Sequence, residues 1–149
     1  MSTKWTTILV SIIVLISVIA GIFVYDMLPD PMASHWNVND EVDGYMSKFW
    51  GVFMMPLVFL GMFLVFLVVP YIDPLKENIA KFRETFNLFI FMMVLFMTYI
   101  WVLTIVWNLG NQSFRMGSAI LPAMGLLFVF IGYMIRKAKR NWFIGIRTP

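Results

Sequence analysis

The sequence has no cysteine and a single histidine, and only 13% of its 149 residues are charged. Without cysteine the chain forms no disulfide and offers no thiolate to a metal ion. A charged content far below the roughly 25% of ordinary soluble domains argues against a water-soluble protein. What is present instead is a 61% hydrophobic chain, a composition typical of membrane proteins.

Long stretches without Asp, Glu, Lys, Arg or His make up most of the chain. We predict membrane spans at residues 6–25, 49–71, 86–109 and 117–135, where these stretches reach the ~20 residues that a helix needs to cross a bilayer. Inside lipid all backbone groups must be paired internally, and stretches this long and continuously apolar achieve that as helices. The sequence therefore predicts an all-α fold, an integral membrane four-helix bundle in which residues 1–149 form a single domain.

The remaining segments are an outer polar loop at residues 26–48, an inner loop at 72–85 and a basic tail at 136–149. Nine of the eleven Lys and Arg residues fall in the N-terminus, the inner loop and the tail, which leaves Lys48 and Arg115 on the other side. This bias predicts a multi-pass cell-membrane protein with cytoplasmic N- and C-termini and an extracytoplasmic loop 26–48. It also accounts for the net charge of +3 without a direct nucleic-acid partner.

The inner loop carries a helical signal of its own. Asp73 and Pro74 are typical of a helix start, because the carboxylate caps free N–H groups and proline suits the first helical position. Leu75, Ile79 and Phe82 then recur at helical spacing. We predict a short amphipathic helix that starts there and lies along the cytoplasmic membrane interface.

The four predicted spans contain no Asp, Glu, Lys, Arg or His, so we expect no proton relay and no catalytic residue within the membrane. One polar face runs along the third span and consists of Thr98, Trp101, Thr104 and Asn108. Such a face usually points into the bundle and forms hydrogen bonds between helices. A small transport or channel subunit that uses this face is an alternative function.

The outer loop concentrates the titratable residues. The loop contains His35 and five acidic residues, namely Asp26, Asp30, Asp40, Glu41 and Asp43. An outward-facing metal-binding protein or metalloenzyme is therefore a second alternative, and His35 is a candidate pH sensor because histidine titrates near neutral pH. Zinc sites usually have more nitrogen or sulfur ligands than this loop supplies, and a calcium loop starting at Asn39 would need glutamate where Trp50 stands. We expect no metal and no other cofactor.

Two motifs in the chain resemble a known family. The loop reads Leu28-Pro29-Asp30-Pro31-x-x-x-His35-Trp36-Asn37 and then Val42-Asp43-Gly44-Tyr45-x-Ser47-Lys48, which is similar to a bacterial and archaeal membrane domain of unknown function. The tail reads Asn141-x-x-x-Gly145-Ile146-Arg147-Thr148-Pro149, which resembles a signature of the SdpI family. The motif positions are Pro29, Pro31, Gly44, Ser47, Lys48, Asn141, Gly145, Arg147 and Pro149.

The resemblance implies a non-enzymatic membrane immunity protein or sensor that meets a secreted antimicrobial peptide at its extracytoplasmic loop. The implied ligand contacts are His35, Trp36, Asn37, Asp30 and Asp43. Besides the lipid bilayer, the implied partners are an extracellular peptide toxin and a cytosolic transcriptional repressor, while the oligomeric state is not indicated. Family members continue past this tail motif to six spans in all, so the chain is expected to be C-terminally truncated or a naturally short relative.

Overall fold

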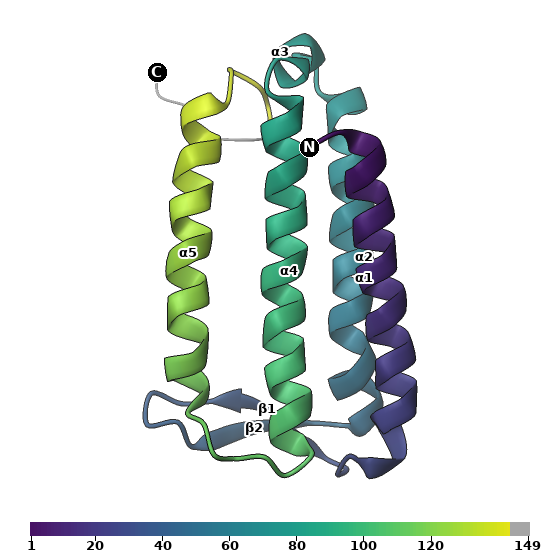
Figure 1. Cartoon of the computed structure of the whole chain (residues 1–149), viewed down its shortest axis with the longest axis vertical. Helices are drawn as coiled ribbons and strands as arrows, with labels where there is room; N and C mark the ends of the chain where they lie inside the picture. Colours follow the sequence, from purple (N-terminus) through teal and green to yellow (C-terminus); the bar gives the residue numbers. More distant parts are fainter. Residues whose placement is uncertain (144–149) are drawn as a thin grey trace.

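A computed structural model of the protein describes residues 1–143. Within this part of the chain, four helices are long and apolar enough to cross a membrane: α1 (Thr3–Val24), α2 (Lys48–Ile72), α4 (Arg83–Asn108) and α5 (Met116–Lys137). They run side by side along the long axis of the molecule (Figure 1). The all-α membrane bundle predicted from the sequence is therefore confirmed, and the helix bounds lie within three residues of the predicted spans.

The two ends of the bundle differ in structure and in charge. The N-terminus, the short helix α3 (Lys76–Ala80) and the end of α5 gather at one end, which we call the basic end (Figure 1). At the other end, the hairpin end, the 3-10 turn η1 (Tyr25–Met27) leads to an antiparallel hairpin of β1 (Met32–Trp36) and β2 (Val42–Met46). The sequence analysis gives this segment only as a polar loop, so the hairpin was not predicted.

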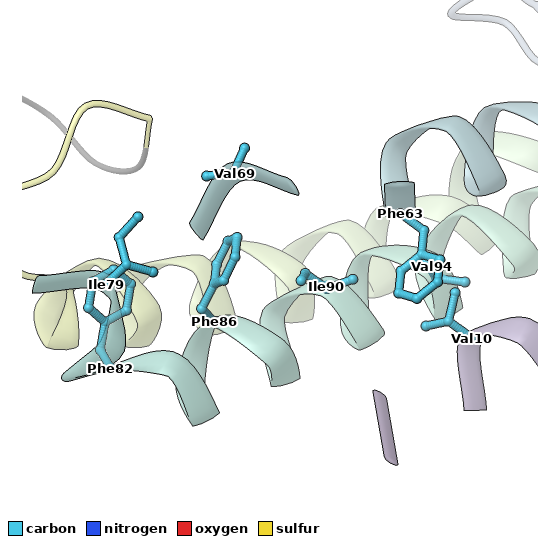
Figure 2. Close-up of a cluster of buried hydrophobic side chains, with 8 residues drawn as sticks. All are labelled: Val10, Phe63, Val69, Ile79, Phe82, Phe86, Ile90 and Val94. Atoms are coloured by element: carbon cyan, nitrogen blue, oxygen red, sulfur yellow. The ribbon is translucent and has the colours of Figure 1, made fainter. Parts of the chain in front are cut away.

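Helix α4 is the centre of the bundle, since it packs against α1, α2 and α5, whereas α5 packs chiefly against α4. At the basic end, α4 contributes to a cluster of buried apolar side chains shown in Figure 2: Val10, Phe63, Val69, Ile79, Phe82, Phe86, Ile90 and Val94. A second cluster toward the hairpin end contains Leu28, Met32, Val52, Phe59, Trp101 and Ile105. Because lipid tails are as apolar as these side chains, close van der Waals packing holds the helices together.

A proline in α2 explains one hydrogen bond between helices. Pro56 has no N–H, so the carbonyl of Val52, four residues earlier, lacks its usual helical donor. The indole N–H of Trp101 on α4 donates to that carbonyl at 2.9 Å. Close by, a Cβ on Gly21 would lie 2.7 Å from a Val52 methyl group, so glycine is needed where α1 meets α2. These contacts fix α1, α2 and α4 at one level of the bundle.

The predicted start of the inner helix is wrong. Asp73 follows the last residue of α2, and α3 begins only at Lys76, after Leu75. The Asp73 carboxylate does accept from a free N–H group, that of Leu75 at 2.6 Å, and it also accepts from Trp142 N in the tail at 2.8 Å. The apolar side of this segment does not face lipid either, since Ile79 and Phe82 are buried in the cluster at the basic end. The inner loop thus closes the end of the bundle and binds the tail.

Candidate ligand-binding cavity at the hairpin end

The turn of the hairpin is organised by Asn37. Its backbone N–H donates to the Glu41 carbonyl at 2.9 Å, and its Oδ1 accepts from the N–H groups of Asn39 at 2.8 Å and Glu41 at 3.1 Å. Its Nδ2 donates to the Glu41 carboxylate at 3.1 Å. Asp40 has a φ of 65°, a left-handed conformation that aspartate tolerates in turns. Asn37 therefore shapes the loop with its own side chain.

Next to the turn, His35 and Asp43 form a pair on the exposed surface of the hairpin. The His35 Nδ1 lies 2.5 Å from an Asp43 carboxylate oxygen, and both side chains are open to solvent. Gly44 stands opposite His35 in the strand register, and a Cβ on Gly44 would come within 2.9 Å of the His35 Cβ. The glycine of the sequence motif is thus required for the close approach of the strands beside this pair.

Helix α4 holds the hairpin through Asn108. The Asn108 Nδ2 donates to the Ala33 carbonyl at 3.0 Å, and its Oδ1 accepts from the Ala33 N–H at 2.9 Å. The same Nδ2 also donates to the Thr104 carbonyl on its own helix at 2.9 Å. Because Ala33 is only 2% exposed, Asn108 replaces water for both of its backbone groups.

Helices α2 and α5 are connected to the hairpin through carboxylates at their N-termini. Asp30 accepts from Lys48 N, in the first turn of α2, at 3.1 Å. Asp40 accepts from Gly117 N in the first turn of α5 at 2.8 Å and from Arg115 Nε at 3.0 Å. The Gly117 N–H and the Arg115 guanidinium lower the pKa of the Asp40 carboxyl below its usual value of 3.8. A carboxylate is favoured at a helix N-terminus, where free N–H groups carry positive partial charge.

Between the hairpin and the helices α2, α4 and α5 lies a cavity of about 260 Å³. Four methionines from β2, α2 and α5 form much of its apolar wall, namely Met46, Met54, Met55 and Met116. Trp36 also lines it, with its ring edge-to-face against Trp107 at a centroid distance of 5.3 Å. The Trp36 indole N–H is buried and has no acceptor among the described residues. Flexible thioether side chains can adapt to ligands of irregular apolar shape.

The structure divides the residues predicted to contact ligand. His35, Trp36 and Asn37 line the cavity together with Ser34 and Asp40. Asp30 and Asp43 are not part of its lining: Asp30 caps α2, and Asp43 pairs with His35 on the exposed side. That these residues contact a ligand stays a prediction. The sequence analysis missed the methionines and the role of Asp40. For Asp40 a signal was available, since Arg115, a possible ion-pair partner, stands directly before the last apolar stretch.

The other motif residues have structural surroundings. Pro29 and Pro31 flank Asp30 where the chain approaches β1, and Ser47 precedes the first residue of α2. Lys48 Nζ lies 4.8 Å from the ring centre of Tyr25. Asn141, which is 4% exposed, donates to the Lys139 carbonyl at 2.7 Å and accepts from Phe143 N at 3.0 Å. The motif positions Gly145, Arg147 and Pro149 lie outside the described residues.

The loop carboxylates are engaged separately rather than gathered around one point. Asp30, Asp40, Glu41 and Asp43 each bond to a different partner. Within residues 1–143, no three Asp, Glu or His side chains are placed to hold one metal ion. The geometry thus gives no support to a metalloenzyme built on this loop.

The polar face of α4 is used for packing. Trp101 and Asn108 bond to backbone groups of α2 and β1. Thr98 and Thr104 donate to carbonyls one turn earlier in their own helix, at 2.8 and 3.0 Å. Because these groups already have partners, the face offers little to a permeating ion or solute, and a channel function gains no support.

Together, the fold and the cavity define a polytopic membrane protein with a structured cap over a small, largely apolar cavity. Comparison with known proteins agrees with this class. Residues 12–60, which run from α1 through the hairpin into α2, match the "Domain of unknown function (DUF1648)". The chain is also similar to "Immunity protein SdpI" of Bacillus subtilis (strain 168), with 26% identity over 138 residues.

This similarity covers 93% of the chain, and the chain spans about 63% of the length of that relative. No solved structure matches the chain. The resemblance to the SdpI family that the two sequence motifs predicted is confirmed by these matches.

Proposed function

We propose that the protein is a membrane immunity protein that receives a secreted antimicrobial peptide in the cavity beneath the hairpin. The observation that carries this proposal is the methionine-lined cavity, which is closed by the same segment that holds the loop motif. The similarity to an immunity protein supports a role in immunity. The role requires a binding site and no chemical reaction, so we infer that the protein is not an enzyme.

The charge distribution supports an orientation for this role. The basic end carries Lys4, Lys76, Lys81, Arg83 and the four cations between residues 136 and 140, whereas Lys48 and Arg115 lie at the hairpin end. By the positive-inside rule, the basic end faces the cytoplasm and the hairpin faces outward. A peptide from outside would then meet the hairpin first, and the basic end would be available to a cytosolic transcriptional repressor.

The dimensions of the cavity indicate how much of a peptide it could hold. At about 260 Å³ it lies just below the roughly 300–1,000 Å³ of typical small-molecule sites. It therefore suits one or two apolar side chains rather than a folded peptide. The exposed His35–Asp43 pair and the Trp36 N–H would supply polar contacts to the peptide near these anchors.

Survival under peptide challenge tests this function. The whole chain is expressed in a sensitive bacterium that is exposed to a panel of secreted antimicrobial peptides, with Met54→Glu, Met54→Leu and His35→Ala as variants. A carboxylate in the cavity disfavours an apolar ligand, whereas leucine conserves volume and polarity. We expect the wild type and Met54→Leu to raise the inhibitory concentration of at least one peptide, His35→Ala to raise it less, and Met54→Glu to give no protection.

Immunoblots of the membrane fraction must show equal amounts of all variants. Protection by Met54→Glu equal to that of the wild type would place the binding site elsewhere. Unchanged survival of wild-type cells across the whole panel would contradict the immunity function itself.

A further inference from the structure

A second cavity, of about 720 Å³, lies at the basic end between the segment that starts α4 and the end of α5. Its lining includes Lys81, Arg83, Arg136, Lys137 and Lys139. These cations come from two segments more than fifty residues apart in the sequence, so the fold rather than a local charge run brings them together. Among the described lining residues, Glu84 is the one acidic side chain.

The cations of this cavity have few partners within the protein. Neither of the ion pairs between described residues involves them. Lys81 donates to the Asn78 amide oxygen at 3.1 Å, while Arg136 and Lys137 lie 5.7 and 6.0 Å from the ring centre of Tyr133. The Arg83 Nε is buried and has no acceptor in the described part of the chain. An anionic group would therefore compensate charge that the protein leaves unbalanced.

The position of the cavity identifies the anion. Its walls come from the start of α4 and the end of α5, both of which are long and apolar enough to span a membrane, so it lies at the level of the lipid headgroups. Further along α5, Phe128 and Val129 are 61% and 73% exposed and offer an apolar surface to acyl chains. Basic pockets between membrane helices are suited to lipid headgroups.

We propose that this cavity binds the headgroup of an anionic phospholipid, with its phosphate among Lys81, Arg83 and Lys137. The guanidinium of Arg83 supplies hydrogen bonds to the phosphate oxygens, and the lysines supply positive charge. Such a lipid would hold the start of α4 and the end of α5 together at the basic end. It would thereby strengthen the attachment of α5, which packs chiefly against α4.

Lipid titration of the purified full chain tests the proposal. The protein is kept in neutral detergent, phosphatidylglycerol or phosphatidylcholine is added, and bound lipid is counted by native mass spectrometry. The cavity variant is Arg136→Gln/Lys137→Gln, and the matched control is Lys4→Gln/Lys76→Gln. Both pairs are exposed, both lie at the basic end, and both remove two positive charges, but Lys4 and Lys76 do not line the cavity.

We expect one phosphatidylglycerol to bind saturably, and phosphatidylcholine to bind much more weakly. A cation close to the anionic headgroup is worth about a fivefold change in affinity, so the cavity variant, which loses two cations from the lining, should bind phosphatidylglycerol roughly 25-fold more weakly than the wild type. The control variant should bind it nearly as well as the wild type. A separate titration with inorganic phosphate should leave phosphatidylglycerol bound.

Equal weakening in both variants would overturn the proposal, because it would indicate diffuse attraction to the whole basic end. Equal binding of both lipids would overturn it as well, since the headgroup charge would then be irrelevant. Displacement of phosphatidylglycerol by millimolar inorganic phosphate would identify the site as one for a soluble phosphate and not for a lipid.

Discussion

Replacement of Asn108 by leucine should release the hairpin from the bundle while the helices stay folded. The variant loses the bonds of 3.0 and 2.9 Å that satisfy the carbonyl and N–H of Ala33. Ala33 is 2% exposed, and a buried backbone group without a partner costs about 1–3 kcal/mol, so the two groups together cost about 2–6 kcal/mol. Asp30 and Asp40 still connect the hairpin to α2 and α5. The loss should therefore appear as local opening.

Hydrogen–deuterium exchange of the Ala33 amide measures this opening, because that N–H donates to Asn108 itself. A cost of at least about 2 kcal/mol predicts exchange that is roughly 30-fold faster or more than in the wild type. Thr98→Val is the matched control on the same helix. The Thr98 hydroxyl donates only to Val94 O, which keeps its backbone donor when the hydroxyl is removed, so exchange at Ala33 should not change.

Exchange of the Ala33 amide within threefold of the wild type in Asn108→Leu would refute this reasoning. It would mean that other contacts, such as the burial of Met32, hold β1 against α4 without the asparagine. An equal acceleration in Thr98→Val would refute it differently, because both variants would then act through a general loosening of α4.

Two further predictions concern single hydrogen-bonding groups. Trp101→Phe leaves the Val52 carbonyl unpaired and should lower the free energy of unfolding in mixed detergent by about 1–3 kcal/mol. In a Pro56→Ala background residue 56 supplies an N–H to that carbonyl, so Trp101→Phe should lower the free energy of unfolding by less; an equal loss would contradict this account. The pKa of Asp40 is lowered below 3.8, so its stabilising effect is complete above pH 3.8 and is lost as the pH falls through its folded pKa. The exchange protection of the Gly117 amide, corrected for intrinsic exchange, should therefore decline in this acidic range in the wild type. The same decline in Asp40→Asn would contradict the assignment of this effect to the Asp40 carboxylate.

The helices could be predicted because a membrane span needs one continuous apolar stretch, which can be recognised in the sequence without knowledge of the rest of the fold. Charge-free stretches of sufficient length directly give the existence of α1, α2, α4 and α5, since lipid leaves the backbone almost no alternative to a helix. The ends are less certain, because helices continue into the interface past charged residues. Thus α4 begins at Arg83 and α5 continues to Lys137, each beyond the apolar stretch used to predict it.

The hairpin could not be predicted for the opposite reason. Its strands of five residues each contain polar residues, and an isolated two-stranded hairpin is marginally stable in water. It forms here against the bundle, through contacts such as Asn108 with Ala33 and Asp40 with Gly117, which are 75 and 77 residues apart. The pattern of apolar and polar residues within one segment does not indicate hydrogen bonds to residues so far away in the sequence. The cavity depends on them as well, since the hairpin forms one of its walls.

The hydrogen bonds of the hairpin also separate motif residues that shape the site from those available to a ligand. Asp30 caps α2, Asn37 closes the turn, and Gly44 is needed for the approach of the strands. If the cavity binds a peptide as proposed, substitution of these residues should weaken binding through the cavity wall, whether or not they also touch the peptide. By contrast, His35 is exposed and Trp36 has a buried N–H without an acceptor in the described chain. Reduced peptide resistance together with unchanged amide-exchange protection of the hairpin is therefore expected for His35→Ala, whereas Gly44→Ala is expected to lose both.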